Sequence, residues 1–499
     1  MNQHDSERMA GLLEEAGYVR TDDDGDADVL VINTCSVREK AEEKLYTRLG
    51  ELRVMGEETG TRPLVAVAGC VAQQEGEKLL SNANGHVIDV LIGTQSLKRL
   101  PVLVENAETA QLKLRATHAE GTAQPQLRPI HADGTAQPQL RPPHAPGSAQ
   151  LQLRVGQGSA QLQLRDWHLH LRDSSPQIDL NPYEDVSFPL GIARRSDPIK
   201  AYVTIIEGCN EFCAFCVVPY TRGHERMRPV ADIVSDVRFA ADTGAKEVQL
   251  LGQIVNHYQA PDDAACDFAE LLARVSQVNG IERIRFASPH PRHVTARMIE
   301  AMRTLPKVCR HLHLPVQSGS TRVLSAMRRR HTRDTYLELV ASLRAAMPDI
   351  ALSTDMIVGV PGETGADFDE TLSLVDAVRY HSIFSFKYSP RPNTLALKRM
   401  ADDVSEEEKT RRIVALQALQ KRIQGEIFEA AVGRTEQVLI DSHSRRRDWE
   451  LSGRTSGNTV VNLAGEPSWL GRMLPVRITA ANPNSLRGEA VLDGSVSAA

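Results

Sequence analysis

The sequence EGCNEFCAFCVVPYTRG at residues 207–223 places three cysteines on one short segment. Cys209, Cys213 and Cys216 have the spacing C-x3-C-x2-C, and they follow an apolar run at 200–208 that is typical of a buried strand. Three thiolates on one loop can hold three corners of a cubane iron–sulfur cluster. Because the segment has no fourth cysteine, one iron of such a cluster would stay open to a substrate or cofactor.

A zinc ion is the alternative for this segment, with the nearby His224 as a further ligand. Zinc sites are usually closed by four ligands that come in pairs along the chain. The cysteine segment instead follows the first strand of a series in which strands and helices alternate. This position favours the iron–sulfur cluster over zinc.

That series runs through residues 195–432 and predicts a barrel-like α/β fold. Helical patterns, for example at 231–243 and 334–346, separate the strand candidates. Six βα units in a row predict a parallel sheet with outer helices, and a closed barrel has eight such units. We therefore expect an open (βα)6 partial barrel. Its predicted strands are 200–208, 247–253, 283–289, 311–317, 351–362 and 383–390.

A long helix and a small β domain are predicted after the barrel. Ser405 and Glu408 have the capping-box pattern of a helix start, and Gly433 marks the end of the helix. Residues 433–496 contain short β-like runs that turn residues separate. This pattern predicts a small β-barrel.

Residues 1–105 predict an open α/β sheet domain. The apolar runs 28–34, 64–69 and 90–93 have the pattern of buried parallel strands. Cys35 and Cys70 each follow one of these strands directly, at the sheet edge where ligand sites gather. The chain itself opens with a helical pattern, and no strand precedes it.

Residues 106–180 consist largely of four imperfect copies of one short unit. The copies are too short, and too rich in Gly, Pro and Gln, to build a solenoid. We expect a disordered insertion without a core. An arm that contacts tRNA through arginines and histidines is the alternative. The copies read THAEGTAQPQLR, IHADGTAQPQLR, PHAPGSAQLQLR and GQGSAQLQLR.

Composition excludes several classes of protein. No run approaches the roughly 20 apolar residues of a membrane span, and the N-terminus lacks a signal-peptide pattern, so we expect a cytoplasmic protein. We also expect it to be a monomer. Seven unevenly spaced cysteines make a poor disulfide framework. Cys266 and Cys309 lie outside the motifs, and we expect them to be buried as small apolar side chains. Aromatic residues, at 4%, are too few for a long stacking platform.

Taken together, the motifs resemble the methylthiotransferases of the radical S-adenosylmethionine (SAM) superfamily, and specifically the tRNA-modifying MiaB type. The resemblance covers 1–105 and about 181–496. Besides the cysteine segment, the matching segments are INTCSVREKAEEK, VAGCVAQQEGE, LLGQIVNHY, KVCRHLHLPVQSGS, TDMIVGVPGET and YSPRPNTLA.

The resemblance implies a methylthiotransferase domain at 1–105, the insertion at 106–180, a radical SAM core at 195–432 and an RNA-binding TRAM domain at 433–496. It implies transfer of a methylthio group to carbon 2 of N6-isopentenyladenosine next to the tRNA anticodon, with SAM as radical source and methyl donor. A radical is needed because no side-chain base removes an aromatic C–H proton, so the protein positions the reactants and excludes water and oxygen. Alternatives are a methylthiotransferase for another tRNA base or a ribosomal protein, and a tRNA-binding protein that has lost sulfur transfer.

The resemblance also implies two 4Fe–4S clusters and their ligands. The cysteines of the 207–223 segment match the ligands of the SAM-binding cluster, and Cys35 and Cys70 match two of the three ligands of the second. Ile254 stands where the family usually has Asn, so a polar contact is lost there. The positions that match SAM contacts are Phe215, Gln253, Ile357 and Gly359.

The third ligand of the second cluster normally lies in a GCQMN segment after the family's first strand. This chain starts with the residues that match the end of that segment. We therefore expect that the true start lies upstream and that the sheet lacks its first strand, which would leave backbone groups unpaired. A complete chain with an incomplete cluster is the alternative.

Two arginine-rich stretches are candidates for binding RNA phosphates. One is SRRR at 444–447, where Arg445, Arg446 and Arg447 would contact RNA. The other is MRRRHTR at 327–333, at the border of the predicted barrel. Because the net charge of the chain is −6, binding of nucleic acid has to depend on local patches of this kind.

Overall fold

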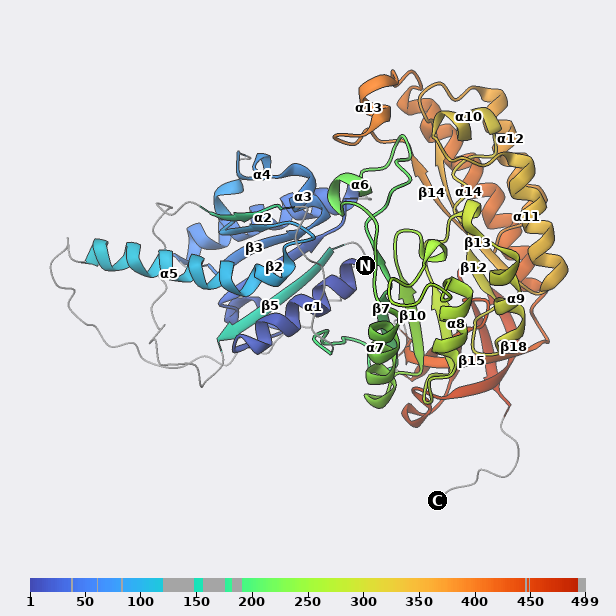
Figure 1. The fold of residues 1–499 in the computed structure, drawn as a ribbon, viewed down its shortest axis with the longest axis horizontal. Helices are drawn as coiled ribbons and strands as arrows, with labels where there is room; N and C mark the ends of the chain where they lie inside the picture. Colours follow the sequence, from blue (N-terminus) through green and yellow to red (C-terminus); the bar gives the residue numbers. More distant parts are fainter. Residues whose placement is uncertain are drawn as a thin grey trace. The chain divides into compact units, whose positions relative to one another are not determined.

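The computed structural model of the 499-residue chain describes most of the sequence, in two compact units (Figure 1). The first unit comprises 2–194 with 220–222, and the second comprises Met1, 195–219 and 223–499. No helix among the described residues is long and apolar enough to cross a membrane. The described residues are 1–36, 39–60, 62–81, 84–119, 148–155, 176–181, 191–444, 447 and 449–491.

The first unit is built on a sheet whose described strands have the order β1-β5-β2-β3-β4-β6. The three central predicted strands are confirmed: β2, β3 and β4 are parallel, and all of their residues are buried. The strands are β1 (Tyr18–Arg20), β2 (Val29–Thr34), β3 (Leu64–Gly69), β4 (Val90–Ile92), β5 (Ser148–Val155) and β6 (Gln177–Asp179).

Helices cover both faces of this sheet. Val31 and alternate strand residues pack with α1 and α5, whereas Ile32 and the residues between them pack with α2 and α3. On the second face, α2 contributes Leu49, whose complete burial is worth about 1.5–3 kcal/mol. The helices are α1 (Asn2–Glu15), α2 (Glu39–Thr59), α3 (Cys70–Glu75), α4 (Lys78–Ser81) and α5 (Leu100–Ala119), with short 3-10 turns at Asp24–Asp26, Gly85–Val87 and Leu97–Arg99.

The expectation that 106–180 forms no ordered structure is wrong for its described stretches. Helix α5 continues to Ala119, β5 pairs antiparallel with both β1 and β2, and β6 pairs parallel with β4. Strand β5 comes from the third repeat copy, which reads AQLQL where the first two copies read AQPQL. Leucine keeps the backbone N–H that a central strand must donate, and proline lacks it.

Because β5 pairs with β2, the edge of the sheet beside β2 differs from our expectation. We expected the sheet to lack a strand, with unpaired backbone groups as the consequence. In the structure β5 lies along the whole of β2, from Val29 opposite Leu153 to Thr34 opposite Ser148. The backbone groups of β2 therefore have a partner strand on that side, because an open edge accepts any segment able to complete its hydrogen bonds.

The second unit contains the predicted open barrel. Each of the six predicted strands includes an observed one, in two three-stranded parallel sheets ordered β11-β10-β7 and β12-β13-β14. No described strand joins β7 to β14, so the barrel stays open. The strands are β7 (Lys200–Thr204), β10 (Glu247–Leu251), β11 (Arg283–Phe286), β12 (His311–His313), β13 (Ala351–Val358) and β14 (Ser382–Lys387).

Outer helices enclose one continuous apolar core. Side chains at polar helix starts fix the ends: Asp267, Thr332 and Thr364 each accept a hydrogen bond from the first helical turn. As expected, Cys266 and Cys309 are buried. The helices are α6 (Val218–Thr221), α7 (Val230–Asp242), α8 (Phe268–Ser276), α9 (Ala296–Thr304), α10 (Thr321–Ala326), α11 (Arg333–Ala346), α12 (Gly365–Val378), α13 (Leu395–Arg399) and α14 (Glu406–Glu429), with 3-10 turns at Val255–His257 and Pro291–His293.

The predicted C-terminal β-barrel is confirmed as a closed barrel in the order β15-β16-β17-β19-β18. Helix α14 leads into it: Ser405 accepts a hydrogen bond from the Glu408 N–H at the helix start, and Phe428 near its end packs into the barrel core. The strands are β15 (Thr435–His443), β16 (Glu450–Thr455), β17 (Val460–Ala464), β18 (Met473–Asn482) and β19 (Ser485–Ala490); the remaining elements are the short β8 (Ile206–Glu207) and β9 (Arg226–Met227) and a 3-10 turn at Pro467–Trp469.

Two arginines of β11 join the open barrel to the C-terminal barrel. Arg283 donates to the carbonyls of Gln437 and Arg454. Arg285 donates to the carbonyls of Thr455 and Ser456, at 2.7 and 3.1 Å. The other side of the Arg285 guanidinium pairs at 2.9 Å with Glu247 of β10, and both side chains are buried.

We expect Arg285→Ala to destabilise the protein by about 3–5 kcal/mol, because it leaves the buried Glu247 carboxylate without its partner. Thermal unfolding of the full chain measures the effect. Arg303→Ala is the matched control, since Arg303 pairs with Glu300 on the exposed surface of α9, where the loss should be small. Equal shifts in melting temperature for the two variants would contradict the expectation.

Candidate functional site

The three cysteines of the 207–223 segment lie on a tight loop beyond β7 and β8. Gly208 has φ +78°, and a Cβ there would stand 2.0 Å from the His224 carbonyl oxygen, so the loop requires glycine at this point. Backbone hydrogen bonds fix the middle of the loop: Ala214 donates to Met327 at 2.9 Å and accepts from Ala396 at 2.7 Å.

The chemistry of these thiols fits a metal cluster. Burial, together with the neighbouring Cys213, raises the pKa of Cys209 to about 11 and that of Cys216 to about 12. At neutral pH the free thiols keep their protons, so binding of a cluster has to release them. The guanidinium of Arg329 lies 3.5 Å from the Cys213 sulfur and can stabilise its anionic form.

The zinc alternative receives no support. The Nδ1 atom of His224 lies 3.1 Å from Asn210 Oδ1, so this ring nitrogen already has a partner. In the described part of the chain, no three or more His, Cys, Asp or Glu side chains are grouped closely enough to hold a metal ion, and this applies to the three cysteines as well as to His224. The preference for an iron–sulfur cluster over zinc therefore rests on the spacing of the cysteines and on their position after β7.

Two of the four predicted SAM-contacting residues share one apolar cluster beside the cysteine loop. Phe215 and Ile357 both pack against it, although they lie far apart in the sequence. Its buried members are Val323, Met327, Val360, Tyr388 and Ala396. The structure thus provides an apolar wall next to the cysteines, which suits the flat face of an adenine.

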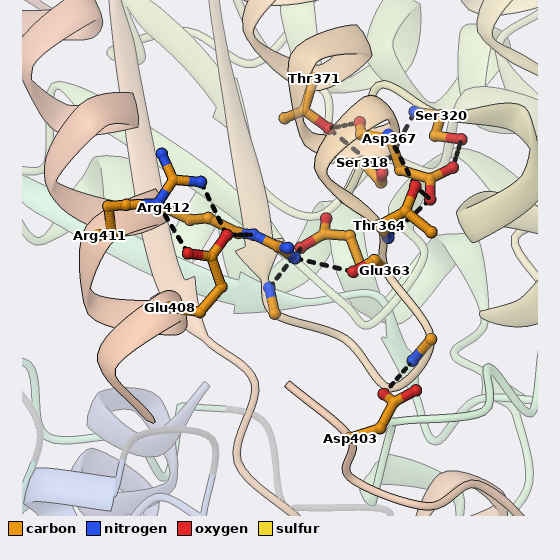
Figure 2. Close-up of polar contacts among 12 residues, drawn as sticks. Ser318, Ser320, Glu363, Thr364, Asp367, Thr371, Asp403, Glu408, Arg411 and Arg412 are labelled. Atoms are coloured by element: carbon orange, nitrogen blue, oxygen red, sulfur yellow. Dashed lines mark hydrogen bonds and ion pairs between the residues drawn. The ribbon is translucent and has the colours of Figure 1, made fainter. Parts of the chain in front are cut away.

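Gly359 follows β13 and is held by a buried carboxylate (Figure 2). Its φ is +70°, and its N–H donates to Glu363 Oε2 at 2.6 Å. The Glu363 side chain has no exposed surface, and Arg412 of α14 pairs with it at 2.8 Å. A Cβ on Gly359 would stand 2.3 Å from the Lys409 side chain, so α14 packs directly against this turn.

A second carboxylate fastens the start of α12 to the loop before α10 (Figure 2). Asp367 accepts hydrogen bonds from Ser320 at 2.7 Å, from Arg322 and from Thr364. Burial opposes the charged form, but these donors together hold the pKa of Asp367 below its usual range. The carboxylate therefore stays ionised and ties three segments together.

The remaining candidates are the predicted SAM contact Gln253 and the predicted RNA-binding arginines at 445–447, and the structure describes only some of them. Gln253 follows β10 and is half-buried, and its Oε1 has no hydrogen-bond partner among the described residues. Its neighbour Ile254 is buried. In the C-terminal barrel, Arg447 pairs with Glu450 at 2.8 Å and lies over the Trp449 ring. Arg445 and Arg446 lie outside the described residues.

The first unit brings Cys35 and Cys70 to neighbouring positions. Cys35 follows β2 and Cys70 follows β3, and in the register of this parallel pair Thr34 stands opposite Gly69. Gly69 has φ +94°, and a Cβ there would stand 2.2 Å from Asn33 Oδ1. Because both cysteines follow directly on adjacent parallel strands, they lie at the same edge of the sheet. Cys70 is buried there and Cys35 is half-buried.

Three polar residues of the site were not predicted from the sequence: Arg329, Glu363 and Arg412. Arg329 lies in the MRRRHTR stretch, which we considered only as a phosphate-binding patch. Glu363 ends the TDMIVGVPGE segment. Its position directly after a glycine-rich turn was the sequence feature that could have identified it as part of the site. Arg412 stands on a charged helix among many similar residues, and no local pattern distinguishes it.

Comparison with known proteins identifies three modules in the same order. The profile of the "Radical SAM superfamily" matches residues 203–375, which contain the cysteine loop and most of the open barrel. The profile of "Uncharacterized protein family UPF0004" matches 1–93, and that of the "TRAM domain" matches 429–491.

Curated relatives match the chain over nearly its full length. A tRNA-2-methylthio-N(6)-dimethylallyladenosine synthase of Alkalilimnicola ehrlichii is 41% identical, over 100% of this chain and 97% of that protein. The enzyme of the same name from Geobacter metallireducens is 40% identical, over 98% of this chain and 96% of that protein. A solved cobalamin-dependent SAM radical enzyme, OxsB, gives a TM-score of 0.42 at 11% identity, over 83% of this chain and 50% of that one. The chain therefore belongs to the radical SAM enzymes of the tRNA-2-methylthio-N(6)-dimethylallyladenosine synthase family.

We expect Glu363→Gln to weaken SAM binding about tenfold or more, because the Gly359 N–H and Arg412 lose a charged acceptor. The dissociation constant of SAM, measured on the cluster-loaded protein, checks this. Glu408→Gln is the control, since Glu408 contacts the other side of Arg412 and does not contact Gly359. Unchanged SAM affinity in Glu363→Gln would show that the turn does not depend on this carboxylate.

We expect Asp367→Asn to lower the free energy of unfolding by about 1.5–3 kcal/mol at pH 7, through weaker hydrogen bonds to its donors. A carboxyl with a lowered folded-state pKa stabilises the fold above its unfolded pKa of about 3.9, and this contribution is lost as pH falls through the folded-state pKa. The stability difference between variant and parent should thus shrink below about pH 4.

Unfolding by denaturant across a pH series measures this difference. Asp376→Asn on the same helix is the control, because Asp376 forms only an exposed pair with Arg422. A difference for Asp367→Asn that stays constant down to pH 2 would mean that its charge is not what stabilises the fold.

Proposed function

We propose that this protein adds a methylthio group to carbon 2 of N6-isopentenyladenosine beside the anticodon of tRNA. The observation that carries the proposal is the three-cysteine loop after β7, in a chain about 40% identical to synthases of that name over nearly its whole length. SAM and a 4Fe–4S cluster are the cofactors that membership of the radical SAM superfamily implies.

In this proposal Cys209, Cys213 and Cys216 hold the SAM-binding cluster. When bound, the cluster and SAM together supply the radical that removes hydrogen from an unreactive C–H bond. The guanidinium of Arg329 stays beside Cys213 and balances the negative charge of the ligand set. Backbone hydrogen bonds donated by Cys209, Ala214 and Cys216 support the loop that carries these cysteines.

The residues around the loop orient SAM. Phe215 and Ile357 offer the apolar wall for its adenine, and Gly359 forms the turn directly after the strand that carries Ile357. Gln253 has an unpartnered amide oxygen that can accept a hydrogen bond from the SAM amino group. Apolar packing behind this wall keeps water away from the reacting atoms.

A second 4Fe–4S cluster in the first unit would use Cys35 and Cys70. Their placement at the ends of two adjacent parallel strands supports this assignment, since such edges gather ligands. This cluster would carry the sulfur that is transferred. The C-terminal barrel and the arginines at 445–447 would contribute to binding of tRNA, which the relatives' names also indicate.

We expect Cys213→Ala to abolish the methylthio product and to lower the iron content by about four atoms per chain, because one cubane loses a ligand. Anaerobic reconstitution, iron analysis and nucleoside analysis of a tRNA carrying isopentenyladenosine measure these quantities. Cys266→Ala is the matched control, as this buried cysteine lies outside both ligand sets. Product formation by Cys213→Ala would overturn the proposed role.

The same assays separate the two clusters. In the double variant Cys35→Ala with Cys70→Ala, we expect SAM cleavage to continue and methylthio product to be absent, with iron lowered by about four atoms. Iron content equal to that of the parent would show that Cys35 and Cys70 are not ligands of a second cluster. Loss of SAM cleavage as well would mean that the variant acts through folding, which melting temperatures would reveal.

A further inference from the structure

The loop between α10 and α11 has an unusual backbone. Arg328 and Arg330 both adopt left-handed conformations, with φ of +58° and +56°. Residues other than glycine rarely do so, and two such residues separated by only one other residue require the surrounding structure to hold them. Between them, Arg329 is buried, donates to the Pro315 carbonyl at 2.7 Å and contacts Cys213. The backbone thus sends one arginine inward and leaves its two neighbours exposed.

The exposed arginines line a pocket of about 870 Å³ between the Pro291–His293 turn, α10 and α11. We call it the arginine pocket. A third arginine, Arg292, lines it as well. Hydroxyl groups complete the polar part of its wall. They belong to Thr321, Ser325, Thr332 and Thr335.

The arginine pocket carries excess positive charge. Its lining contains three arginines and no carboxylate. The carboxylate of Glu211 lies 3.3 Å from Arg292 and 3.8 Å from Arg330. Three arginines and this one carboxylate leave a net charge of about +2. Arg328 forms no ion pair with any described residue. Burial and the neighbouring Arg329 lower the pKa of His331 to about 4, so this lining imidazole is neutral at pH 7.

These features suit a phosphate group. Guanidinium groups match phosphate oxygens in paired hydrogen bonds, and several arginines around one pocket give a site of this kind. The N-terminus of the 14-residue helix α11, capped by Thr332, adds its positive end at the same wall. Because the net charge of the chain is −6, binding of a polyanion has to depend on a local patch such as this one.

We propose that the arginine pocket binds a backbone phosphate of the tRNA substrate, with Arg328 and Arg330 as its main ligands. This inference rests on the proposed function, because tRNA is the polyanion concerned. The pocket adjoins the cysteine loop through two contacts: Arg330 reaches Glu211 within that loop, and Arg329 reaches Cys213. A phosphate held here is therefore anchored to the same loop that carries the cluster ligands.

The test is the salt dependence of tRNA binding by the cluster-loaded full chain. Each phosphate contact contributes about 0.7–0.9 to the slope of log K against log salt concentration. In Arg328→Gln we expect the slope to fall by about one and the affinity for a tRNA transcript to fall about tenfold near 0.1 M salt. Arg328→Lys, which keeps the charge and the same backbone strain, should retain most of the slope.

Controls separate this effect from damage to the fold. Arg303→Gln removes an exposed arginine that does not line the pocket, and its slope should equal that of the parent. The dissociation constant of SAM should be unchanged in Arg328→Gln. Adding Arg330→Gln should lower the affinity for tRNA further with little additional change in slope, because the pocket holds a single phosphate. Loss of SAM binding in that double variant alone would show that Arg330 acts through Glu211 instead.

Each outcome decides the matter. An unchanged slope in Arg328→Gln overturns the inference while leaving the proposed function intact, provided that the parent binds tRNA. A parent that binds no tRNA refutes the proposed function itself. A third outcome combines two results: inorganic phosphate saturates the pocket below about 1 mM, although a single free ion would ordinarily bind more weakly, and the variants leave the salt slope of tRNA binding unchanged. In that case the pocket is a site for free phosphate and the inference is wrong.

Discussion

A carboxylate with no exposed surface stands behind the turn that follows β13. Glu363 cannot be buried as an anion without donors, and it finds them in the Gly359 N–H and the Arg412 guanidinium. This requirement fixes the turn of the strand that also carries Ile357, and it fixes the start of α14 against that turn (Figure 2). Since α14 continues into the C-terminal barrel, a single buried charge links the turn after β13, the last core helix and the domain beyond it.

Local patterns in the sequence were sufficient for most of the architecture. The three central strands of the first unit, the strands of the open barrel, the closed C-terminal barrel and the cysteine loop followed from short-range features: apolar runs, turn residues and the C-x3-C-x2-C spacing. The neighbouring positions of Cys35 and Cys70 were also accessible, because parallel strands present their ends at one edge. Each of these features depends on residues that lie close together in the sequence.

The polar contacts that complete the site were not accessible in this way. Arg329 reaches Cys213 across 116 residues, and Arg412 reaches Glu363 across 49. Which arginine of a charged helix turns inward depends on the packed structure and leaves no periodic signal. Strand β5 is the clearest failure, because its repeat has the composition of a disordered segment. Its pairing is decided by the open edge of β2, which lies more than 100 residues away.

The arginines of β11 have a consequence for how the second unit loses its structure. Carbonyl groups of the C-terminal barrel, at Gln437, Arg454 and Thr455, depend on Arg283 and Arg285 of the core for their hydrogen bonds. The barrel cannot open at this face without leaving two buried guanidinium groups unsatisfied in the core. The two parts therefore form one cooperative unit, and a defect in the C-terminal barrel lowers the stability of the part that holds the cysteines.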